Sequence, residues 1–314
     1  MSTPTGPASG LPVRMPRPRQ TGRHRRPEPL AAPEGAPALV LAVPGTPGSD
    51  TRSLAEEVVS IARSELPGLD ARIGYLDGDD EEFPALGSVL AHAAAERAER
   101  AARAAELRRI EGAEGGVAQD DDGPVAVVVP LLAGPDSALM RRIRQAVMES
   151  RTAAELTDVL GPHPLLAEAL HVRLSEAGLA RADRARLFTV ATAADGIVLA
   201  TVGGEEAVQA AGITGMLLAA RLAVPVLAAA LDVDGSVNGA AEQLRGSGSE
   251  QLALAPYLIG PEVADGLLKA AADEAGCVSG EVLGAYPAIG RLVLSQYAAA
   301  LGIASQLTQG SPAR

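Results

Sequence analysis

Four side chains that could bind a cation each follow a short apolar segment of the sequence. They are three carboxylates and one imidazole: Asp77, Asp136, Asp232 and His163. If the apolar segments are parallel strands, their carboxyl ends meet at one edge of a sheet and bring these groups together. Carboxylates suit hard, oxygen-preferring cations, whereas an imidazole suits Co²⁺ or Fe²⁺. We expect Asp136, Asp77 and His163 as metal ligands, with Asp136 as the first candidate for a catalytic role.

Two of these residues can also be interpreted as helix caps. Asp136 stands directly before the helical pattern of residues 137–149, where an Asp side chain commonly accepts backbone N–H groups. His163 lies in a turn ahead of residues 164–176, where it could cap or pack. The acidic run at residues 79–82 indicates a solvated turn rather than a metal site.

Backbone amides in two glycine turns offer a second kind of binding group. Gly45-Thr46 and Gly203-Gly204 each come between an apolar segment and a helical pattern. The N–H groups at such helix starts bind anions. We therefore expect these four residues to contact a carboxylate-bearing ligand.

The composition excludes several classes of protein. The chain has 314 residues, 47% of them hydrophobic, and a net charge of −12, although residues 1–27 carry six Arg and no acid. An acidic body repels nucleic-acid phosphates, so we expect no nucleic-acid partner. The longest apolar stretch, residues 216–231, contains Arg221 and Pro225, which predicts no membrane span. The single Cys277 excludes an intramolecular disulfide and fits a cytoplasmic protein.

Short apolar segments alternate with helical patterns, which predicts an α/β fold with parallel sheets flanked by helices. The expected strands are residues 38–43, 71–76, 125–132, 157–160, 196–201, 224–231, 251–258 and 280–283. The expected helices are residues 52–64, 85–107, 137–149, 164–176, 206–220, 236–245, 262–275 and 287–301.

An internal repeat divides the chain into two similar Rossmann-like lobes. Four segments recur in the same order: 40–45 in 198–203, 75–79 in 230–234, 129–143 in 255–269, and 158–170 in 281–293. We expect lobes at residues 39–180 and 181–305, an insertion near residues 96–123 in the first, a disordered basic tail at residues 1–38, and a tail at 306–314. Two such lobes commonly bind a ligand in the cleft between them.

With its duplicated α/β pattern, PLLAG (130–134) and LGPHPLLAEAL (160–170), the chain resembles the sirohydrochlorin chelatases in their long, duplicated form. The resemblance implies insertion of a divalent metal, Co or Fe, into a tetrapyrrole held between the lobes. The metal is then a substrate, and we expect no tightly bound cofactor. It also implies a histidine pair, one in a GHGS loop and one in an AGxH segment.

This chain lacks both histidines of that pair. Pro44 stands at the first position and Asp136 at the second, and the other copy has Val202-Gly203-Gly204 and Gly260-Pro261-Glu262. The resemblance implies substrate contacts at Gly45, Thr46, Gly134, Gly203 and Gly204. Two functions stay open: a chelatase in which Asp136, Asp77 or His163 replaces the histidines, or a non-catalytic protein that binds a tetrapyrrole, a metal ion or a partner.

Overall fold

The computed structural model describes residues 31–33, 35–110, 123–180, 194–260, 262–264 and 266–302. Most of the expected basic tail lies outside these residues, as do the expected tail at 306–314 and the later part of the expected insertion.

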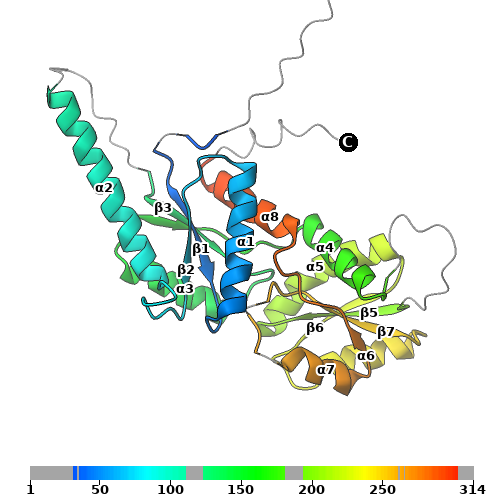
Figure 1. Ribbon diagram of the computed structural model, residues 1–314. Helices are drawn as coiled ribbons and strands as arrows, with labels where there is room; N and C mark the ends of the chain where they lie inside the picture. Colours follow the sequence, from blue (N-terminus) through cyan, green and yellow to red (C-terminus); the bar gives the residue numbers. More distant parts are fainter. Residues whose placement is uncertain are drawn as a thin grey trace, which may run out of the picture.

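Two four-stranded parallel sheets form the framework of the chain (Figure 1). The first has the order β2 (Ala71–Tyr75), β1 (Ala38–Val43), β3 (Ala126–Pro130) and β4 (Ala154–Leu156). The second has the order β6 (Val226–Ala230), β5 (Gly196–Thr201), β7 (Leu252–Pro256) and β8 (Val278–Ser279). The expected α/β class with two Rossmann-like lobes is confirmed, and the two sheets have the same strand order.

Eight helices in the described part of the chain flank the sheets. They are α1 (Ser49–Glu65), α2 (Leu86–Ile110), α3 (Ser137–Glu149), α4 (Pro164–Glu176), α5 (Gly204–Leu222), α6 (Ser236–Gly246), α7 (Leu267–Ala275) and α8 (Pro287–Ala300). None of them combines the length and the hydropathy needed to cross a bilayer.

The central strands are buried at every position, and almost wholly apolar, because helices cover both faces of each sheet. All six residues of β1 and all six of β5 are buried. A strand that is buried on both faces has a continuous apolar sequence rather than one that alternates between apolar and polar residues. The near absence of aromatic residues leaves Ala, Val and Leu to fill these layers.

The last helix of each half of the chain packs on the sheet of the other half. Helix α8 lies against α1 and β3, and α4 lies against α5 and β7. The Tyr297 hydroxyl of α8 donates to the carbonyl of Pro37, 2.7 Å away at the entrance to β1. Arg173 of α4 donates Nη2–H to the Leu283 carbonyl at 2.8 Å. The repeat in sequence therefore does not coincide with two separate bodies in space.

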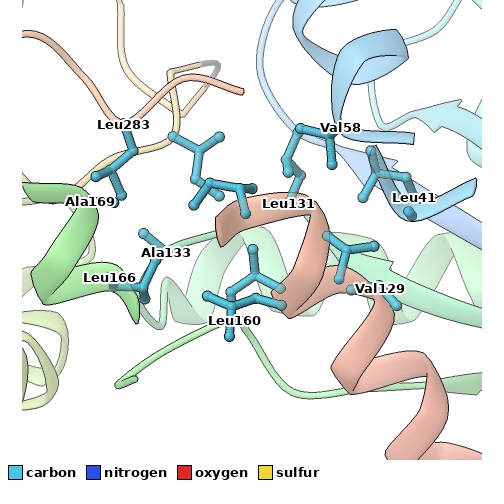
Figure 2. Packing of buried hydrophobic residues seen from close by; sticks show 14 of the residues in the cluster. Leu41, Val58, Val129, Leu131, Ala133, Leu160, Leu166, Ala169 and Leu283 are labelled. Carbon is cyan, nitrogen blue, oxygen red and sulfur yellow. The ribbon is translucent and has the colours of Figure 1, made fainter. Parts of the chain in front are cut away.

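This exchange of helices produces a continuous core between the sheets. One cluster of buried residues combines Leu41 and Val129 of the first sheet, Leu166 of α4, and Leu283 of the second half. Figure 2 shows Leu283 close to Ala169 and, on the other side of the same cluster, Leu41 near Val58. Separate clusters fill the outer faces, beneath α2 and α3 on the first sheet and beneath α6 and α7 on the second.

Three expected elements are displaced along the chain. The last strand occupies Val278–Ser279 instead of residues 280–283, where Gly280 and Leu283 still donate to Leu254 and Leu258. The fourth strand occupies Ala154–Leu156 instead of residues 157–160, which continue as an extended segment with Thr157 and Leu160 donating to Val128 and Leu132. Helix α7 begins at Leu267 instead of residue 262, because Glu262 uses its carboxylate to accept backbone amides ahead of the helix. The expected insertion begins inside α2, which is exposed at every position from Ala98 to Ile110.

Candidate functional site

A cavity of about 700 Å³ lies between the two halves of the chain, at the carboxyl ends of β1 and β7. The loop that joins β1 to α1 forms one wall, from Gly45 to Thr51. The segment after β7 forms the other: Ile259, Gly260, Glu262, Val263 and Ala264. Leu54 and Val282 complete the described lining. The volume falls within the range of about 300–1,000 Å³ that small-molecule sites occupy.

The start of α1 contributes polar groups to this cavity. Gly48 is the N-cap, has an extended backbone, and supplies no capping side chain. The Ser49 hydroxyl donates to the Asp50 carboxylate at 3.2 Å, and the Thr51 hydroxyl donates to the backbone carbonyl of Thr46 at 3.4 Å. Both hydroxyls act as donors in these bonds, so neither bond caps an amide of the helix start. The first-turn amides of α1 thus lie at the wall of the cavity, together with the hydroxyls.

Glu262 is the partly buried carboxylate of the opposite wall. Its Oε1 accepts the amide hydrogen of Ile259 at 2.8 Å and its Oε2 that of Gly260 at 2.6 Å. Burial raises the pKa of Glu262, while backbone amides, including that of Ala133 in the first half, oppose the rise. A carboxyl group in such surroundings holds its proton to higher pH than an exposed one and can exchange it with a ligand.

The corresponding loops of the repeat, after β3 and after β5, pack directly against each other. Gly203, in the loop after β5, packs so tightly on the loop after β3 that a Cβ there would lie 2.7 Å from the Pro135 carbonyl oxygen. A Cβ at Gly134 would lie 3.1 Å from the Tyr257 ring. Gly134, Asp136 and Gly203 therefore meet at one contact between the halves, whereas Gly45 and Thr46 line the open cavity.

The amides of Gly203 and Gly204 already have an anionic partner within the chain. Asp232 accepts the Gly203 hydrogen at 3.0 Å and that of Gly204 at 3.2 Å. Its carboxylate thereby caps α5, whose N-cap Gly203 has no side chain to do so.

The expected cation ligands are separated and engaged elsewhere. Asp136 is the N-cap of α3, and one of its oxygens accepts from Ala138 and Leu139, both at 2.9 Å. Asp77 forms an ion pair with Arg142. His163 caps α4 by accepting from Leu165 at 3.1 Å, and burial lowers its pKa. In the described residues, His, Cys, Asp and Glu form no group of three or more that could hold a metal ion.

Pro44 and the acidic run at residues 79–82 are structural. Pro44 is buried at the end of β1, immediately before the cavity loop. Asp79 accepts the amides of Glu81, Glu82 and Phe83, at 2.9 to 3.0 Å, which is the turn that the sequence predicts.

Comparison with solved structures identifies the fold. The chain matches the sirohydrochlorin chelatase SirB from Bacillus subtilis subspecies spizizenii in complex with cobalt, at a TM-score of 0.55, with 11% identity over 86% of this chain and 97% of that one. SirB from Bacillus subtilis with Fe³⁺ matches at a TM-score of 0.55 and 12% identity, over 86% of this chain and 98% of that one. The chain has a chelatase-like fold. No family model and no curated protein matches its sequence.

Glu262 was not among the predicted site residues, although it lines the cavity of this chelatase-like fold. The repeat pairs residues 129–143 with 255–269, and in that pairing Glu262 is the counterpart of Asp136. The same position thus carries an acid in both halves, and only the copy in the second half lines the cavity. The repeat is therefore the sequence signal that indicates Glu262.

Proposed function

We propose that this chain binds a tetrapyrrole in the cavity between its two halves. The observation that carries the proposal is the cavity itself, formed by the loop at Gly45-Thr46 and by the segment at Glu262. The loop at Gly45-Thr46 is one of the segments in which the resemblance to the chelatases implies ligand contacts. The chelatase-like fold and the names of its structural neighbours, sirohydrochlorin chelatases, support the choice of ligand.

The lining suits a flat ring with acidic side chains. Leu54, Val263 and Val282, each partly exposed, offer apolar surface for the ring. The amides at the start of α1 offer positive dipole ends for carboxylates of the ligand. Glu262, with its raised pKa, is suited to hydrogen-bonding the pyrrole nitrogens.

A titration of the full chain with sirohydrochlorin tests this proposal. We expect a saturable shift of the ligand absorption band and a higher melting temperature of the protein. Thr46→Trp narrows the cavity at an exposed position and should weaken binding by about tenfold or more. Ser60→Trp, on the exposed outer side of α1, is the matched control and should leave binding unchanged. If sirohydrochlorin produced no spectral shift and no rise in melting temperature with the unmodified chain, tetrapyrrole binding would be refuted.

Metal insertion at the same cavity is a second candidate function, and the position of Glu262 favours it. When a divalent cation replaces the two pyrrole protons of the ring, a nearby base must accept them. Glu262 could accept one, and water the other. Co²⁺ or Fe²⁺ added to the protein–ligand mixture should then convert the metal-free spectrum faster than without protein. Glu262→Gln should abolish that acceleration and keep binding, whereas Glu250→Gln should alter neither. A rate equal to the protein-free reaction would leave binding alone as the function.

A further inference from the structure

The cavity between the two halves carries negative charge that its own lining does not balance. The described lining includes two acids, Asp50 on the α1 wall and Glu262 on the opposite wall, and no Lys, Arg or His. Asp50 accepts the Ser49 hydroxyl, and Glu262 accepts the amides of Ile259 and Gly260. Within the part of the chain that the structure describes, neither carboxylate has a cationic partner. The chain as a whole is also acidic, with a net charge of −12.

The basic residue that follows the cavity loop is engaged elsewhere. The guanidinium of Arg52 lies over the Phe83 ring, 4.5 Å from its centroid. It donates to the Glu82 carboxylate at 2.9 Å and to the Glu82 carbonyl at 3.1 Å. These contacts hold the positive charge on the loop between β2 and α2, and Arg52 is not among the residues that line the cavity.

The α1 wall of the cavity presents hydrogen-bond donors beside the acid. The first amide that bonds within α1 is that of Arg52, which donates to the Gly48 carbonyl at 2.9 Å. The amides ahead of it have no acceptor within the helix. A helix start of this kind supplies about half a positive charge. That charge does not balance two carboxylates, so the cavity combines free donors with a net negative potential.

A carboxamide group is complementary to both kinds of group in the cavity. Its carbonyl oxygen can accept from the first-turn amides of α1, and its N–H groups can donate to Asp50 or Glu262. Glu262 can accept a further hydrogen, because a carboxylate has about four acceptor positions. A carboxylate on the ligand can use only the amides, since it has no hydrogen to donate and repels both acids.

We propose that the cavity selects tetrapyrroles whose side chains end in carboxamides over those whose side chains end in carboxylates. This selectivity rests on the proposed binding of a tetrapyrrole and adds the chemistry of the ligand's side chains. Sirohydrochlorin, a polycarboxylate, binds the same cavity more weakly. Asp50 and Glu262 are the residues that discriminate between the two classes of ligand.

Three ligands with the same ring test the proposal: sirohydrochlorin, its methyl ester and its carboxamide. Each is titrated into the full chain in one mildly alkaline buffer, in which exposed carboxylates are ionised. We expect the carboxamide to bind about tenfold more tightly than sirohydrochlorin, with the ester between them because it is uncharged but cannot donate. Added salt screens repulsion, so it should strengthen sirohydrochlorin binding and leave carboxamide binding nearly unchanged.

A pair of variants tests the residue that we assign to the α1 wall. Asp50→Asn removes one carboxylate from the cavity and should strengthen sirohydrochlorin binding by about threefold to tenfold. Glu57→Gln is the matched control, because it removes the same charge from an exposed position of α1 outside the lining. It should leave all three affinities unchanged. Equal melting temperatures of the two variants would confirm that both fold.

The outcomes distinguish this selectivity from tetrapyrrole binding itself. If none of the three ligands binds, both proposals are wrong. If sirohydrochlorin binds as tightly as the carboxamide, or if its binding weakens with salt, tetrapyrrole binding stands and the selectivity is overturned. If the ester binds as tightly as the carboxamide, the cavity rejects charge without recognising the amide, which also overturns the selectivity for carboxamides.

Discussion

The carboxylate of Asp232 accepts the amide hydrogen of Gly203 at 3.0 Å, across the loops that follow β6 and β5. It also accepts that of Gly204, so one acid from a neighbouring loop caps a helix that begins with two glycines. Both glycines have positive φ values, 108° and 66°, which a residue with a side chain rarely adopts. The helix start thus keeps a conformation that excludes Ser or Asp as a local cap, and Asp232 replaces them from a distance.

Removal of this cap should destabilise the chain. We expect Asp232→Ala to lower the free energy of unfolding by about 1 kcal/mol, the usual contribution of an N-cap. Urea denaturation measures the change. Asp234→Ala removes an exposed acid of the same loop and should have little effect. In the variant the freed amides should bind anions, so sulfate should stabilise Asp232→Ala more than the unmodified chain. Equal responses to sulfate would contradict this role of Asp232.

Substitutions of Asp136 should separate capping from metal binding. Asp136→Asn keeps an oxygen that accepts the Ala138 and Leu139 amides, so its stability should stay within a few tenths of a kcal/mol of the unmodified chain. Asp136→Ala should lose about 1 kcal/mol. Cobalt titrations monitored by absorbance should be the same for both variants and the unmodified chain. A loss of cobalt binding in Asp136→Asn would instead identify a metal ligand.

Tyr257 should make the chain sensitive to alkali. Burial raises the pKa of Tyr257 to about 12, against 10.0 for an exposed phenol. As pH rises from 10.0 toward about 12, the unfolded chain loses this proton while the folded chain keeps it, so stability falls over that interval. Tyr257→Phe removes this contribution. Its urea midpoint should therefore decline less steeply with pH than that of the unmodified chain.

Tyr257→Phe should also lower the free energy of unfolding at neutral pH. The Tyr257 hydroxyl accepts a hydrogen bond from Thr214 at 3.2 Å, and its loss should cost about 1 kcal/mol. Identical alkaline slopes for Tyr257→Phe and the unmodified chain would show that another group controls the loss of stability.

Gly290 should tolerate no side chain. A Cβ at this position of α8 would lie 2.5 Å from Ile61 Cγ2 and 3.1 Å from the Val58 carbonyl oxygen, both on α1. Gly290→Ala should therefore cost about 1–3 kcal/mol through overpacking. Gly239→Ala in α6 is the control, because a Cβ there meets nothing within 4 Å. It should stabilise the helix by about 0.5–1 kcal/mol. Equal melting temperatures would contradict the tight contact of α8 with α1.

Local sequence patterns predicted most of the helices and strands, because an apolar run or a helix cap involves only a few neighbouring residues. Helices α3 and α4 have the predicted bounds because Asp136 and the His163-Pro164 pair mark their starts. The site was harder to predict. Gly45 and Thr46 line the cavity as the loop pattern indicates. Asp136 and Gly203 instead lie where the loops after β3 and β5 pack directly against each other. Which contact stays open depends on how α4 and α8 join the halves, and no local pattern encodes that arrangement.

The exchanged helices also determine when the chain can finish folding during synthesis. The strands of the first sheet leave the ribosome early, yet α8, which packs against α1 and β3, follows every strand of the second sheet in the sequence. A domain usually folds as a unit once its chain has emerged. Here the first half must wait, with the apolar surface of α1 uncovered, until α8 (Pro287–Ala300) has been translated. A ribosome stalled before residue 287 would therefore hold a first half that is exposed to chaperones, whatever the stability of the finished protein.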